Sequence, residues 1–229
     1  MIQPAGLVPF TTIDFPERLA AVIFLQGCPL RCPFCHNPTL QIVGTPTDIS
    51  WSDVFSFLER RKGRLDGIVL SGGEPLMSPD VKPLCARIKD MGYQLAIHTS
   101  GVYPERLQEI LPFVDWVGLD VKAPRRKYDL LTGRPNMVNK VWESLTLLRE
   151  SNIPFECRTT CDPRYLTIDD ISQLGTELAE CGVSTYVLQT YRTFDGDINP
   201  PSESEIQSFF RNVELQDQLK SLFPHYSTR

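Results

Sequence analysis

The chain has 229 residues, of which 41% are hydrophobic and 22% charged, a composition typical of a globular protein with a sizeable core. Its formal net charge of −5 at pH 7 argues against a broad nucleic-acid surface, which is normally basic, so no nucleic-acid partner is expected. No apolar stretch is long enough to cross a bilayer, and the N-terminus lacks the pattern of a signal peptide; we expect a cytoplasmic protein without membrane contact.

Short apolar segments alternate along the chain with amphipathic ones. The expected strands, nearly continuous in apolar residues as buried parallel strands are, cover residues 21–26, 67–71, 94–99, 116–121, 155–160 and 185–191. The expected helices cover residues 51–61, 81–91, 104–111, 140–150, 168–181 and 202–222. Six βα repeats predict a parallel sheet with right-handed crossovers, but periodicity alone leaves a doubly wound sheet and a barrel open. We expect one domain over residues 1–229, with its core at about 18–192 and a C-terminal extension at 193–229.

The loop after the first expected strand carries three closely spaced cysteines, Cys28, Cys32 and Cys35. Thiolates are soft ligands, and a loop this short can bring three of them onto one face of an iron–sulfur cluster. A [4Fe–4S] cluster bound by three thiolates keeps one iron without a protein ligand, and an open site is what a catalytic metal centre needs.

Structural zinc is the alternative for these cysteines, because Cys-x2-Cys spacing is common in zinc sites. A closed zinc site needs a fourth ligand, for which the adjacent His36 or the pair Cys157 and Cys161 are the candidates. The fourth ligand normally comes from a second half-site, and the motifs farther along the chain have no use in a zinc site. We therefore favour the cluster.

Polar motifs follow the later strands, where a barrel of parallel strands gathers its functional residues. The second expected strand ends in Ser-Gly-Gly-Glu-Pro, whose glycines let a ligand approach the backbone and whose Glu74 supplies a carboxylate. Asp120 and Lys122 are two residues apart on a strand, so they share a face and together suit ribose hydroxyls and a carboxylate. Arg158 on the next strand suits bidentate binding of a carboxylate.

In this order, the Cys-x3-Cys-x2-Cys loop, with Phe34 before its last cysteine, and the Gly-Gly-Glu-Pro turn resemble those of the radical S-adenosylmethionine (SAM) enzymes. The resemblance implies an α/β fold, a six-stranded partial (β/α)6 TIM-like barrel of parallel strands with a C-terminal helix and an open side for a large substrate. It implies one [4Fe–4S] cluster on the three cysteines, whose free iron chelates SAM. The family's reduced cluster cleaves SAM to methionine and a 5′-deoxyadenosyl radical, which abstracts a hydrogen atom from the substrate.

The resemblance also implies a set of SAM contacts on the cysteine loop and at the strand ends. These are Phe34, His36, Gly72, Gly73, Glu74, Thr99, Ser100, Asp120, Lys122, Arg158 and Gln189. Activating enzymes of the family often carry an acidic residue followed by Thr-Asn-Gly where this chain has His98, Thr99, Ser100 and Gly101. Any role of that acid is therefore not carried over to His98.

Two segments are similar to the activating proteins of glycyl radical enzymes, in particular those of anaerobic ribonucleotide reductase. They are the lead-in at residues 7–16 and the segment at 26–38 that ends in Cys-His-Asn-Pro, although Glu17 stands where these relatives usually have glycine. The similarity implies that the enzyme generates a glycyl radical on a partner enzyme, with an electron donor such as flavodoxin or ferredoxin. A radical SAM enzyme acting on a small molecule or a different peptide remains the alternative, and a structural zinc-binding module is a distant one.

One basic cluster, Lys122, Arg125, Arg126, Lys127 and Arg134, has two interpretations. It is either a solvated loop or a surface that guides an acidic partner to the barrel mouth.

Overall fold

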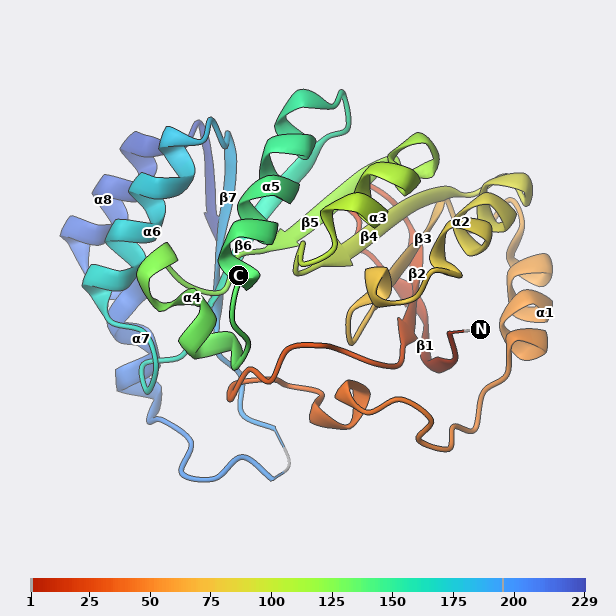
Figure 1. The fold of residues 1–229 in the computed structure, drawn as a ribbon, viewed down its shortest axis with the longest axis horizontal. Coiled ribbons are helices and arrows are strands. Elements are labelled where there is room, and N and C mark those ends of the chain that lie inside the picture. The colour runs from red at the N-terminus through yellow and green to blue at the C-terminus, as the bar shows by residue number, and fades with distance from the viewer. Residues whose placement is uncertain (1, 195) are drawn as a thin grey trace.

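The computed structural model describes residues 2–194 and 196–229. Its strands form one eight-stranded sheet, in which they are arranged in the order of the chain (Figure 1). The strands are β1 (Pro4–Thr11), β2 (Ala20–Leu25), β3 (Gly67–Gly72), β4 (Gln94–Thr99), β5 (Trp116–Asp120), β6 (Phe155–Cys161), β7 (Thr185–Thr190) and β8 (His225–Thr228). The α-helices are α1 (Trp51–Arg61), α2 (Val81–Asp90), α3 (Pro104–Ile110), α4 (Arg125–Thr132), α5 (Met137–Glu150), α6 (Ile168–Glu180), α7 (Glu203–Arg211) and α8 (Val213–Leu222). Short 3-10 turns lie at Pro38–Gln41, Pro75–Met77 and Leu111–Phe113.

The six expected strands are present as β2 to β7, and all of them are parallel. The sheet is wider than expected by one strand at each edge. β1 pairs antiparallel with β2, and β8 pairs parallel with β7. The two edge strands escaped the sequence pattern because β1 is interrupted by Pro4, Gly6 and Pro9 and β8 is a short polar segment.

Two helical expectations also needed correction. The basic segment that begins at Arg125 is helix α4, which caps its C-terminal end with Gly133 at φ +66°. The single helix expected at 202–222 is two helices, because Asn212 is extended and its side chain accepts a hydrogen bond from the Leu215 N–H at 2.8 Å to begin α8. The expected N-cap Ser50 is present, in a capping box with Asp53.

Successive side chains along each strand point to opposite faces of the sheet. One face packs against the helices in a large apolar core that holds Ile23, Leu70 and Leu119. The other face is the interior of the curved sheet, where Val22, Val69 and their neighbours form a small separate cluster. With helices on one face only, the arrangement is consistent with an open barrel.

The loop between β1 and β2 fills the interior at the amino ends of the strands. Phe15 is 4% exposed, and its ring centroid lies 6.2 Å from that of Trp116 at the start of β5. Above it, His98 Nε2 donates to the Asp14 carbonyl at 2.8 Å. We call Phe15 and the apolar residues packed around it the plug. The plug fills the interior at the amino ends of the strands, so the open space lies at the carboxyl ends, where the polar groups are. Among the described residues, no helix is long and apolar enough to cross a membrane.

Candidate cofactor site

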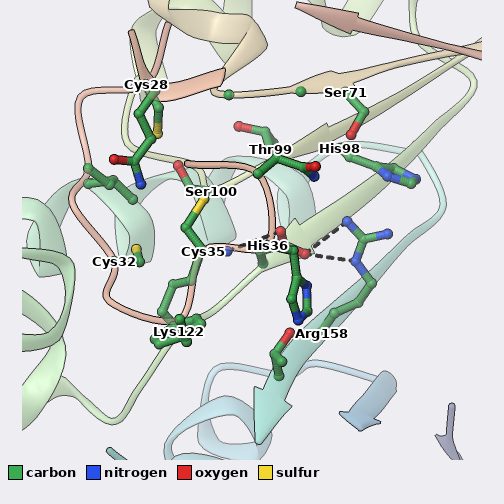
Figure 2. Close-up of a pocket in the computed structure, with 18 of the residues that line it drawn as sticks. Cys28, Cys32, Cys35, His36, Ser71, His98, Thr99, Ser100, Lys122 and Arg158 are labelled. Carbon is green, nitrogen blue, oxygen red and sulfur yellow. Dashed lines mark hydrogen bonds and ion pairs between the residues drawn. The ribbon is translucent and has the colours of Figure 1, made fainter. Parts of the chain in front are cut away.

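A cavity of about 280 Å³ lies at the carboxyl ends of the strands. Figure 2 shows the cysteine loop on one side of this cavity and the strand residues His98 and Arg158 on the other. The predicted site residues on its wall are Cys28, Cys32, Phe34, Cys35, His36, Gly72, Gly73, Thr99, Ser100, Asp120, Lys122, Arg158 and Gln189. The structure thus brings together every predicted residue except Glu74.

The cysteine loop is held in place mainly through its backbone. Gly27 N–H donates to the Leu40 carbonyl at 2.7 Å, and Arg31 N–H donates to the Thr132 carbonyl at the end of α4 at 2.8 Å. Leu30 is buried beneath the loop. These anchors turn the three thiols toward a common cavity.

Burial raises the pKa of the Cys28 thiol to about 12 and raises that of Cys32 as well. Thiolates in this position therefore need a compensating positive charge, which bound iron supplies. The donor set fits an iron–sulfur cluster with three protein ligands.

The fourth ligands considered for zinc lie elsewhere. Cys157 and Cys161 are fully buried in the core between sheet and helices and do not line the cavity. His36 lines the cavity, but its Nε2 accepts a hydrogen bond from the Arg192 N–H at 3.3 Å and its ring lies 5.3 Å from that of Tyr191. The structure does not complete a closed zinc site around Cys28, Cys32 and Cys35 with any of these groups.

Glu74 supports the site from behind the cavity wall. Its Oε1 accepts from the Thr99 hydroxyl at 2.7 Å, and its Oε2 accepts from the Ser100 N–H at 2.8 Å. It also accepts from the Ser100 hydroxyl and the Leu76 N–H, so both carboxylate oxygens are occupied. Burial raises the pKa of the Glu74 carboxyl, although these hydrogen bonds act to lower it. Glu74 therefore ties the end of β4 to the turn after β3.

The two glycines before Glu74 are required by close backbone packing. A Cβ on Gly73 would lie 2.2 Å from the Gly27 carbonyl oxygen, and one on Gly72 would lie 2.3 Å from Leu25 N. Gly72 also adopts φ +122°, which side chains disfavour. The turn thus lies directly against the start of the cysteine loop, with its backbone on the cavity wall.

Asp120, Lys122 and Arg158 form the charged centre of the site. Arg158 Nε donates to Asp120 Oδ1 at 2.8 Å, and Lys122 Nζ donates to Oδ2 at 3.2 Å. Burial alone would raise the pKa of Asp120. The positive charges of Arg158 and then Lys122 outweigh this effect and hold that pKa well below its usual range. The Arg158 guanidinium passes Gly118, where a Cβ would lie 2.8 Å from it. The predicted shared face of Asp120 and Lys122 is confirmed, because both line the cavity.

Sequence reasoning missed a group of residues that brace the cysteine loop from β6 and β7, which we call the rim clasp: Asp162, Arg164, Tyr191 and Asp197. Arg164 donates to Asp162 at 2.6 Å and to Asp197 at 2.7 Å, and the Tyr191 hydroxyl donates to Asp197. Tyr191 in turn packs on His36. The sequence signal was the Arg-Thr-Thr-x-Asp-Pro run that ends just after β6, and the partners of its Asp162 come from other positions in the chain.

The basic segment is engaged within the chain. Arg126 and Lys127 both pair with Asp170 of α6, at 2.5 and 2.7 Å. The Arg125 guanidinium lies 4.4 Å from the centre of the Trp142 ring. Their contacts attach α4 to its neighbours, which favours a structural role over a surface that guides a partner.

Comparison with known proteins gives a consistent result. The family described as the Radical SAM superfamily matches residues 22–174. A protein of Methanocaldococcus jannaschii named as a glycyl-radical enzyme activating enzyme is 31% identical in an alignment 220 positions long that covers 89% of this chain and 88% of that one. A pyruvate formate-lyase-activating enzyme of Staphylococcus aureus is 31% identical over 72% of this chain and 70% of its own length.

Solved structures share the fold at low identity. A radical SAM methyltransferase from Sphaerobacter thermophilus matches with a TM-score of 0.69 at 16% identity, over 100% of this chain and 76% of that chain. SuiB of Streptococcus suis bound to S-adenosylmethionine matches with a TM-score of 0.66 at 14% identity, over 89% of this chain. This chain spans about half the length of SuiB, 48% of it.

Proposed function

The chain belongs to the radical SAM superfamily, an enzyme family whose cofactors are a [4Fe–4S] cluster and SAM, and from this premise we propose that it generates a glycyl radical on a partner enzyme. One observation carries the proposal: three thiols line a single cavity together with the ion-paired Asp120, Lys122 and Arg158. The relatives named as activating enzymes support the type of substrate, which we take to be a glycine in a partner protein.

We assign the cluster to Cys28, Cys32 and Cys35. When bound, the cluster and SAM together supply the one-electron chemistry that removes a hydrogen atom from a substrate C–H bond. The chain's own part is to orient these groups and to exclude water. The buried Leu30 and Phe34 support the exclusion of water at the carboxyl ends of the strands, and the Phe15 plug closes the amino ends.

We assign SAM to the same cavity, mainly to the residues at the strand ends. Asp120 and Lys122 suit ribose hydroxyls and a carboxylate, and their ion pairs with each other and with Arg158 hold them ready before SAM arrives. The backbones of Gly72 and Gly73 suit the ammonium group, and Thr99 and Ser100 are placed by Glu74. Phe34, His36 and Gln189 complete the proposed contacts. Glu74 acts here as a positioning residue, since it does not line the cavity.

For the partner we propose anaerobic ribonucleotide reductase, with flavodoxin or ferredoxin as the electron donor. Support comes from the lead-in at residues 7–16 and from the Cys-His-Asn-Pro ending of the cysteine loop. In the fold, the lead-in supplies the second part of β1 and the start of the following loop, including Asp14, whose carbonyl accepts a hydrogen bond from His98 on the cavity wall.

The test is anaerobic incubation of the cluster-loaded enzyme with SAM, a reductant and the anaerobic ribonucleotide reductase of the same cell. We expect a glycyl radical doublet in the electron paramagnetic resonance spectrum that depends on all three additions. SAM cleavage without a radical on this or any other glycyl radical enzyme of that cell would favour a small molecule or a different peptide as substrate. A lack of SAM cleavage by a fully loaded enzyme would contradict both assignments.

A further inference from the structure

A second cavity, of about 230 Å³, lies beside the cofactor cavity and between the two edges of the sheet. One wall comes from Ile13 and Asp14 after β1, and the other comes from Arg192 after β7 and Arg229 after β8. We call it the side cavity. It shares Arg158, His36 and Gln189 with the cofactor cavity, so a group bound there adjoins the cofactor site.

The side cavity is rich in guanidinium groups. Three arginines line it, Arg158, Arg192 and Arg229, against one carboxylate, Asp14. Arg158 is neutralised by Asp120 and belongs to the cofactor site. The distribution is unexpected for a chain with a net charge of −5.

Arg229 is fixed in place by both its backbone and its side chain. Its guanidinium forms a bidentate salt bridge with the buried Glu156, in which Nη1 donates to Oε1 at 3.0 Å and Nη2 donates to Oε2 at 3.1 Å. Its N–H donates to the Leu188 carbonyl at 3.0 Å, and its carbonyl accepts from the Thr190 N–H at 2.7 Å. The side chain is nevertheless 40% exposed, so the face of the guanidinium turned away from Glu156 remains accessible.

Arg192 is anchored but not neutralised. Its backbone N–H donates to His36 at 3.3 Å, which places it next to the cysteine loop. Over residues 2–194 and 196–229, no carboxylate forms an ion pair with its exposed side chain. Among the described residues, the positive charge that Arg192 brings to the side cavity is therefore not neutralised by an ion pair.

We propose that Arg192, with Arg229 on the same cavity, binds a carboxylate of the substrate close to the reacting C–H bond. A guanidinium binds a carboxylate through two parallel hydrogen bonds, which fixes orientation as well as position. Resting on the proposed function, the inference specifies the substrate further: an extended partner segment with an Asp or Glu side chain near the reacting glycine.

The test measures peptide binding to the anaerobic enzyme loaded with cluster and SAM, by fluorescence anisotropy. The probes are short labelled peptides with one glycine and a nearby Asp or Glu, matched with peptides that carry Asn or Gln instead. We expect the acidic peptides to bind about tenfold more tightly, and the difference to shrink as salt rises.

Arg192→Gln should abolish the preference for the acidic peptide, and Arg192→Lys should keep part of it. The matched control is Arg60→Gln on α1, an exposed arginine that lines neither cavity and should leave binding unchanged. Arg192 is the principal site of the test because Arg229→Gln would leave the buried Glu156 without its partner.

The outcomes separate this inference from the proposed function. If peptides bind equally well with acid or amide, or if Arg192→Gln retains the preference, the inference fails while glycyl radical formation still stands. If no peptide binds, the inference fails whatever the partner assay gives. A missing glycyl radical together with acid-dependent, Arg192-dependent binding would overturn the proposed function and leave the carboxylate site in place.

Discussion

At the scale of single residues, the site is a set of charges that compensate one another before any cofactor arrives. Asp120 is held between Arg158 and Lys122, and Asp120 in turn raises the pKa of Lys122 although burial opposes this. The ion pairs keep these groups charged in a half-buried place, where a lone charge is costly. Lys122 also lies close enough to the thiols to lower the pKa of Cys28 and Cys32, but burial outweighs it and the pKa of both thiols stays raised.

Replacing Cys28, Cys32 or Cys35 by Ala should abolish cluster binding, because each removes one of three ligands. Cys157→Ala and Cys161→Ala are the controls, since those thiols lie in the core behind the sheet. Iron content and the visible absorption of anaerobically prepared protein provide the measurement. Equal loss of iron from both groups of variants would overturn the assignment.

Asp120→Asn and Lys122→Ala should weaken SAM binding by about tenfold to a hundredfold, on the order of 1.5–3 kcal/mol, since each removes a charge-assisted contact. Iron content should stay at the level of the unaltered protein. The matched control is Lys220→Ala on α8, whose pairing with Asp217 at 3.8 Å is exposed to solvent. Calorimetric titration with SAM decides the matter, and unchanged affinity in both site variants would remove this pair from the proposed SAM contacts.

His98 should make the fold less stable in acid. Burial lowers its pKa from 6.5 to about 3, so between these values the unfolded chain binds a proton that the folded chain does not. Its contribution to the free energy of unfolding is therefore complete above pH 6.5 and falls toward pH 3, by up to about 1.4 kcal/mol per pH unit.

The variant His98→Gln keeps a donor for the Asp14 carbonyl but has no proton to gain. Denaturant unfolding at a series of pH values should show a shallower loss of stability below pH 6.5 than in the unaltered protein. Parallel slopes for the two proteins would mean that His98 is already protonated in the fold.

At the scale of elements, the strands that carry apolar runs could be predicted, and so could the residues at their ends. β2 to β7 follow from nearly unbroken apolar segments, and the period of two along a strand placed Asp120 and Lys122 on one face. Helix α4 could not be predicted in this way, because its basic residues look like a solvated loop in the sequence. Their partner, Asp170 of α6, is distant in the chain and meets them only in the fold. The edge strands and the rim clasp depend likewise on contacts with elements distant in sequence.

The role of Glu74 was the least accessible of the site predictions. Its motif suggested a carboxylate facing the ligand, whereas the side chain is turned inward to Thr99 and Ser100. The substitution of Ser100 for the usual amide matters here, because a hydroxyl and an N–H of the same residue both donate to one carboxylate oxygen. Spacing along the chain gives no information about which way such a side chain turns.

Gly73→Ala should separate the turn after β3 from the cysteine loop, because its Cβ would lie 2.2 Å from the Gly27 carbonyl oxygen. We expect a loss of about 1–3 kcal/mol in the free energy of unfolding and weaker SAM binding. Gly6→Ala on β1 is the control, since its Cβ meets nothing closer than 3.8 Å. Denaturant unfolding of both variants tests this, and equal stabilities would contradict the close packing described.

At the scale of the whole molecule, the sheet leaves its interior accessible where its two edges face each other. The plug closes the amino ends, the cysteine loop and the rim clasp cover part of the carboxyl ends, and the side cavity lies between the loops that follow β1, β7 and β8. The composition of the chain did not reveal this local excess of arginine, because the residues concerned lie on separate elements. Arg158, Arg192 and Arg229 come together only in the folded chain.

The strand order has a consequence for how the chain is made. Each strand from β2 to β7 pairs with the strand that precedes it and the one that follows it in the sequence, so the sheet can grow strand by strand as the chain leaves the ribosome. The cofactor site is different, because it joins Cys28 near the beginning to Arg158 on β6. The cysteine loop therefore cannot meet all of its partners in the cavity until β5 and β6 have been synthesised. Iron–sulfur insertion is best timed after that point, and a nascent chain stalled before β6 would be the form most vulnerable to oxygen.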